Sequence, residues 1–135
     1  MEAKDLEVIV KSERLNPKGD NLILEIKDGK IKYYDIDCKE IKEADITDKE
    51  AAVFAYVAEQ VRFFDISDEP IGINLNIHEG YLDTPINDWI TIKAGDKKKT
   101  VCALFCGVAT PGAYNAMVWQ AIKLGQAKAG HSFFG

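Results

Sequence analysis

The hairpin that decides the fold lies at residues 22–34, which read LILEIKDGKIKYY. Two runs rich in β-branched and aromatic residues flank Asp28-Gly29. Asp-Gly is favoured in two-residue type I′ turns, because both central residues of that turn need a positive φ. The stretch therefore predicts two antiparallel strands, at residues 22–26 and 30–36.

Outward from this hairpin, the first half gains one more strand and a helix. Residues 6–12 contain Val-Ile-Val and predict a strand. A charged connector covers residues 37–46, and Thr47 and Glu50 then have the spacing of a capping box. Apolar residues recur behind the box with helical periodicity, so we expect a helix over about residues 48–64.

The second half shows a similar order of elements. Apolar and polar residues alternate over 71–78, and a second β-rich run covers 89–93. Residues 100–106 are apolar on both faces, which predicts a strand in the sheet interior. Thr110-Pro111 suits the start of a helix that ends near Gly125. The expected inner stripe of this helix comprises Tyr114, Met117, Val118, Ala121 and Ile122.

The two halves together predict a single α+β domain over residues 1–135. Its order is βββα-βββα, in a mostly antiparallel sheet of about six strands with two helices on one face. The structural halves are residues 1–66 and 67–130, followed by a tail at 131–135. The repeated order indicates an internal duplication.

Composition restricts the class of protein. The chain has 135 residues and a net charge of −5, so it repels phosphate backbones and nucleic acid is not expected as a partner. Three cysteines without CxxC spacing, and a charged start that cannot serve as a signal peptide, predict three unpaired thiols and a cytoplasmic location. Residues 100–122 carry no charge, but Gly107, Pro111 and Gly112 interrupt them, so we expect no membrane span.

No set of residues predicts catalysis, and we expect no metal or other cofactor. His78 and Glu79 are adjacent on an expected strand and so point to opposite faces. Cys102 and Cys106 lie too far apart on a strand to share a metal, and we expect both to be small buried hydrophobic residues.

Two functional hypotheses remain open. The first is a non-catalytic assembly protein that acts as a homo-oligomer, with Trp119, Phe133 and Phe134 at its interface. Seven acidic residues between positions 35 and 50 are also compatible with a basic protein partner. The alternative is a small-molecule-binding domain or small enzyme, with a pocket between the sheet and the second helix. This pocket would be lined by His78, Trp89, Cys106 and Tyr114.

Overall fold

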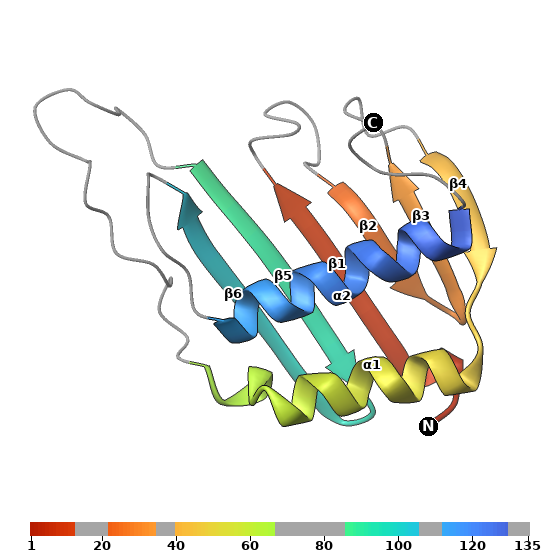
Figure 1. Ribbon diagram of the computed structural model, residues 1–135, viewed down its shortest axis with the longest axis horizontal. Coiled ribbons are helices and arrows are strands. Elements are labelled where there is room, and N and C mark those ends of the chain that lie inside the picture. The colour runs from red at the N-terminus through yellow and green to blue at the C-terminus, as the bar shows by residue number, and fades with distance from the viewer. Residues whose placement is uncertain (13–21, 35–39, 67–85, 106–111, 130–135) are drawn as a thin grey trace, which may run out of the picture.

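The computed structural model describes residues 1–12, 22–34, 40–66, 86–105 and 112–129. Six strands form one antiparallel sheet in the order β4-β3-β2-β1-β5-β6. Both α-helices cover the same face of this sheet (Figure 1). The strands are β1 (Leu6–Ser12), β2 (Leu22–Lys27), β3 (Lys30–Tyr34), β4 (Glu40–Asp45), β5 (Ile86–Ala94) and β6 (Lys97–Phe105). The helices are α1 (Asp48–Gln60), α2 (Gly112–Ala129) and two short 3₁₀ turns, η1 (Ala3–Asp5) and η2 (Phe63–Asp65). The α+β class and the predicted helix-on-sheet architecture are confirmed.

The β2–β3 hairpin has the predicted turn. Asp28 and Gly29 both adopt a positive φ, at 54° and 74°. The sheet continues beyond β3 because the charged segment predicted as a connector contains β4. Its acids face lysines of β3: Asp45 pairs with Lys30 and Glu43 with Lys32 in the register. Opposite charges on directly opposed positions stabilise a strand pair, even where the sequence lacks an apolar alternation.

The expectation that residues 100–106 lie inside the sheet is wrong for the described part of the chain, where β6 is an edge strand. The reason is that β1 pairs with a hairpin on each side, with β2 and with β5. The β5–β6 hairpin joins β1 through β5, which leaves β6 outermost. The strand predicted at residues 71–78 lies outside the described residues, and the internal duplication stays a prediction.

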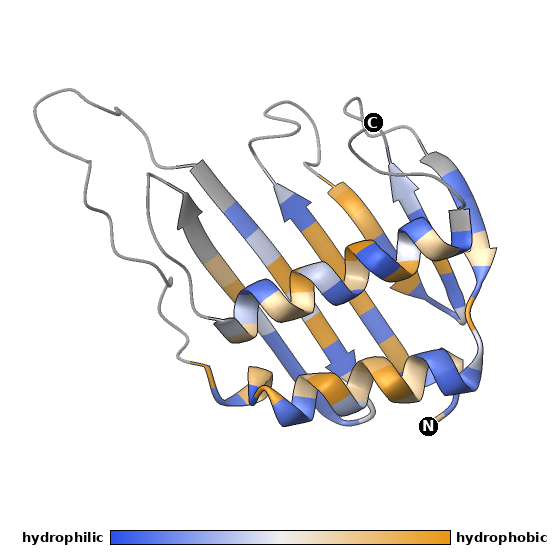
Figure 2. Cartoon of the chain, in the orientation of Figure 1, coloured by the Kyte–Doolittle hydropathy of each residue, from blue (hydrophilic) through white to orange (hydrophobic). Residues whose placement is uncertain are grey.

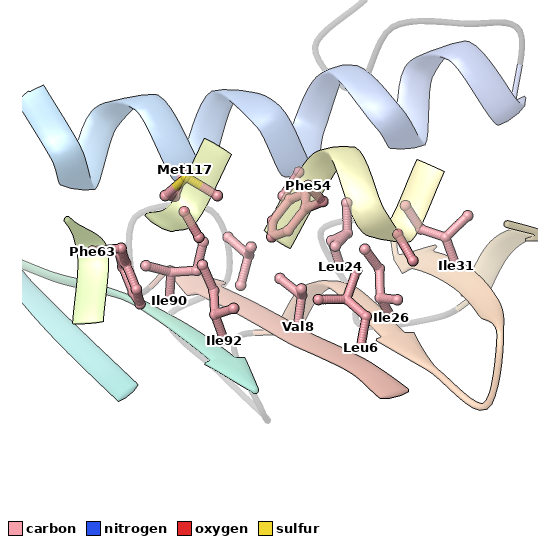
Figure 3. Close-up of a cluster of buried hydrophobic side chains, with 14 of the residues drawn as sticks. Leu6, Val8, Leu24, Ile26, Ile31, Phe54, Phe63, Ile90, Ile92 and Met117 are labelled. Carbon is pink, nitrogen blue, oxygen red and sulfur yellow. The ribbon is translucent and has the colours of Figure 1, made fainter. Parts of the chain in front are cut away.

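The core lies between the sheet and the helices. Alternate residues of the central strands, such as Val8, Ile26 and Ile90, are fully buried on the helix-covered face. Phe54 of α1 and Met117 of α2 pack onto them from above (Figure 3). Colour by hydropathy shows the same alternation along the strands (Figure 2).

The start of α1 follows the predicted capping rule, whereas α2 does not end at the glycine predicted to stop it. Thr47 caps α1 as predicted: its Oγ1 accepts from the Glu50 N–H at 3.0 Å, and the Glu50 carboxylate accepts from the Thr47 N–H at 2.9 Å. In contrast, α2 continues past Gly125 to Ala129, so the predicted stop is wrong. Gly125 is buried, in line with buried Ala121, and packing of this side of α2 overrides the low helix propensity of glycine.

Candidate functional site

The structure does not bring together Trp89 and Tyr114, the two described residues of the predicted small-molecule pocket. Tyr114 lies on the sheet side of α2 and is 2 % exposed. Trp89 is half-buried on β5, between Asp88 and Ile90, which both point into the helix-covered face. Successive side chains of a strand point to opposite faces, so the sheet separates Trp89 from Tyr114. His78 and Cys106 lie outside the described residues.

Trp89 instead belongs to the open face of the sheet. The register places it between Lys11 of β1 and Cys102 of β6. The next row of this face holds a hydroxyl pair, Thr91 and Thr100, whose Oγ1 atoms are 2.8 Å apart. Cys102 is a half-buried thiol here rather than a core residue, because its neighbour Val101 takes the buried position.

Charged pairs also lie on the open sheet face. Lys93 approaches Glu7 at 3.4 Å, and Lys30 approaches Asp45 at 2.9 Å. The bond and charge of Asp45 hold the pKa of Lys30 above its usual value, and Lys30 lowers the pKa of Asp45 in the same way. A hollow of about 80 Å³ lies over the β2–β3 hairpin, too small for more than solvent or a small ion.

Two buried polar residues were missed by the sequence analysis. Ser12 and Asp88 are 2 % and 6 % exposed and face each other across β1 and β5. They occupy the positions where the alternation of Val8 and Val10, or of Ile90 and Ile92, would place another apolar side chain. That break in the pattern was the available signal.

The helical layer carries the largest exposed hydrophobic side chains of the described residues apart from Met1. Val53 and Tyr56 on α1 are 51 % and 63 % exposed, and Trp119 on α2 is 54 % exposed. Trp119 was predicted as an interface residue, and the structure places it on the protein surface. Phe133 and Phe134, predicted with it, lie outside the described residues.

Val53 and Trp119 lie differently with respect to the space between the two helices. Gln120 and Leu124 line a groove shared with α1, so they mark the side of α2 that faces α1. A helix turns 100° per residue, and Trp119 is therefore directed about 140° away from Leu124. Lys123, which also lines the groove, follows Trp119 by four residues and is directed only about 40° away from it. Trp119 therefore lies beside the α2 rim of the groove without lining it, whereas Val53 lines the groove from α1.

The groove between α1 and α2 has a volume of about 300 Å³. Its lining consists of Lys49, Glu50, Val53, Phe54, Gln120, Lys123 and Leu124. The two helices run antiparallel (Figure 1), and Lys128 in the last turn of α2 binds Glu50 in the first turn of α1 at 2.6 Å. Burial raises the pKa of Glu50, but the bonds from Lys128 and from Thr47 lower it more, so this pKa lies below its usual value.

Neither a metal centre nor a membrane span emerges from the described ranges. No group of three or more His, Cys, Asp or Glu side chains among them could hold a metal ion. None of the helices in these ranges is long and apolar enough to cross a bilayer. Comparison of the chain with protein-family models, with curated proteins and with solved structures gave no match.

Proposed function

We propose that this chain is a non-catalytic interaction protein of the cytoplasm that assembles as a homo-oligomer. The observation that carries the proposal is Trp119, which is 54 % exposed on α2. Tryptophan combines a large apolar area with few rotatable bonds and is enriched among the residues that dominate binding energies. A tryptophan on the solvent side of a helix is therefore a natural anchor for an interface.

The helix row around Trp119 is suited to pairing with itself. Asn115, Trp119, Ile122 and Gln126 follow at intervals of four, three and four residues, which places them along one side of α2. The row reads amide, apolar, apolar, amide in both directions. An antiparallel second copy would set each Trp119 beside Ile122 of the other copy and each Asn115 beside its Gln126.

The energetics favour a second copy as the occupant of this row. None of the four side chains is charged, so a two-fold axis brings no like charges together. Ile122 is 7 % exposed and contributes only its edge, so Trp119 supplies most of the area. Burying the exposed part of Trp119 on both copies removes about 200 Å² of apolar surface from water, worth about 5 kcal/mol. That free energy changes a dissociation constant by about three to four orders of magnitude.

Light scattering on Trp119→Ser tests this role. The full chain should have at least the mass of a dimer at tens of micromolar, and Trp119→Ser should shift the mass toward the 15.0 kDa monomer. Tyr56→Ser is the matched control, because Tyr56 is a still more exposed aromatic on the other helix and off this row. A wild-type chain that stays monomeric at hundreds of micromolar would refute self-association. If Tyr56→Ser lowers the mass and Trp119→Ser does not, the row around Trp119 is not the interface.

The tail predicted as part of the interface can be tested in parallel. Deleting residues 131–135 removes Phe133 and Phe134. If these side chains contribute to the interface, the mass should fall while the melting temperature at low concentration stays unchanged. A lower melting temperature with unchanged mass would instead assign the tail to the folded monomer.

A further inference from the structure

We propose that the groove between α1 and α2 binds an acidic amphipathic helix of a partner protein. The proposal rests on the interaction role proposed above, but it concerns the residues that line the groove, and Trp119 is not one of them. It is argued from the shape of the groove, from its apolar lining and from the charges on its rim.

The lining of the groove suits the apolar face of a helix. Phe54 is 3 % exposed and forms the floor, whereas Val53 on the wall is 51 % exposed. Half-buried Leu124 supplies the opposite wall from α2. A groove between two helices accepts the side-chain ridge of a third, and its volume of about 300 Å³ has room for apolar side chains of such a ridge.

The rim of the groove is positive although the chain as a whole carries −5. Lys49 of α1 and Lys123 of α2 are exposed, one on each wall. No ion pair within the described part of the chain involves either lysine. The one acid of the lining, Glu50, is neutralised by Lys128. The groove therefore offers two cations to an incoming segment, and carboxylates flanking its apolar face would pair with them.

The helices of a second copy do not offer such a segment. No acidic residue occurs in α2. The acids of α1 are already engaged: Asp48 accepts from the Ala3 N–H at 2.7 Å, Glu50 binds Lys128, and Glu59 binds Lys97 at 2.5 Å. The helices of a second copy therefore offer no free acids to Lys49 and Lys123, which favours a helix of a different protein as the occupant.

An anionic membrane is the other class of partner that apolar and basic residues could indicate. Membrane recognition by charge uses clusters of about four to eight basic residues. The groove has two, and its apolar lining is recessed between the helices. The observations favour a peptide ridge over a lipid surface.

Fluorescence anisotropy with designed peptides tests the proposal on the full chain. The probe is a labelled helical peptide of about 18 residues, with leucines on one face and glutamates flanking them. A second peptide carries lysines in place of the glutamates. We expect the glutamate peptide to bind at least about tenfold more tightly at low ionic strength, and this preference should shrink as salt is added.

Charge reversal in the groove provides the decisive comparison. Lys49→Glu combined with Lys123→Glu should reverse the preference, so that the lysine peptide binds more tightly. The matched control is Lys27→Glu combined with Lys98→Glu, which makes the same change in net charge at exposed positions on the open sheet face. This control should bind like the wild type. Equal affinity for the two peptides, or equal effects of the two double variants, would overturn the proposal.

Two further measurements separate the proposals and the partner classes. Trp119→Ser should bind the glutamate peptide normally, since Trp119 does not line the groove. A wild-type chain that is monomeric but still discriminates between the peptides would refute only the homo-oligomer. An oligomer that does not discriminate would refute only the acidic helix. A membrane would be the partner of the groove under a third pattern of results. The wild type would sediment with phosphatidylserine vesicles, Lys49→Glu combined with Lys123→Glu would not, and the wild type would bind the two peptides equally.

Discussion

Replacing Phe63 by alanine should lower the free energy of unfolding by about 3–5 kcal/mol. Phe63 follows α1 in η2, is 0 % exposed, and closes the core beside Ile90 (Figure 3). Full burial of its side chain accounts for about 2–3 kcal/mol. The cavity left behind and the lost edge-on contact with Phe64, at 5.6 Å between ring centroids and 86° between planes, supply the remainder.

Urea denaturation followed by far-ultraviolet circular dichroism measures this loss. The midpoint should fall with little change in the slope, and the melting temperature should drop by about 10–20 °C. Phe64→Ala is the matched control, because Phe64 is only half-buried at the margin of the core, with the Lys97 ammonium 5.8 Å from its ring centroid. It should lose about 1–2 kcal/mol. A loss below about 1 kcal/mol for Phe63→Ala, or equal losses for the two variants, would show that Phe63 does not close the core.

Substitutions at two further positions test the two ends of α1. Because the folded pKa of Glu50 is depressed, its stabilising contribution is present above the unfolded pKa of about 4.3 and is lost as the pH falls through the folded value. Glu50→Gln should therefore lower the free energy of unfolding by about 1 kcal/mol at pH 7, and this difference from the wild type should vanish below about pH 4. A difference that stays constant with pH would contradict the pairing of Glu50 with Lys128. At the other end Arg62 adopts a φ of 60°, a left-handed conformation in which glycine avoids the Cβ clash. In urea denaturation, Arg62→Gly should be about 1 kcal/mol more stable than Arg62→Ala. The opposite order would show that the positive φ at position 62 is not strained.

The features that follow from neighbouring residues were predictable. The Asp28-Gly29 turn depends on the φ preferences of two residues, and the Thr47 cap depends on a contact three residues away. The buried stripe of α2 likewise follows from the helical period, and Tyr114, Met117 and Ala121 are all buried. The common physical reason is that each requires only groups within about one helical turn or one tight turn.

The faces of the sheet needed the tertiary structure. Alternation along β5 groups Trp89 with Thr91 and Lys93, and Asp88 with Ile90. The helices cover the side of Asp88 and Ile90, so Trp89 is directed away from Tyr114 and the expected pocket is not formed by these two residues. The buried positions of Asp88 and Ser12 also depend on the pairing of β1 with β5, which are separated by more than half of the chain.

The sequence by itself determined the turns, the cap of α1, the inner stripe of α2 and the α+β class, because each is set by the covalent order of nearby side chains. The stripe expected on α1 was wrong at Val53, which is 51 % exposed, because the sheet lies against Ala51, Phe54 and Ala58 instead. Only the tertiary structure decided the strand order and the groove. Acidic β4 became a strand because β3 supplied facing lysines. Within the described part of the chain, β6 lies at the edge because it joins the sheet through β5 and β1 is already paired on both sides. Lys49 and Lys123 are distant in the chain and became opposite walls of one groove because α1 and α2 pack antiparallel on the same face of the sheet.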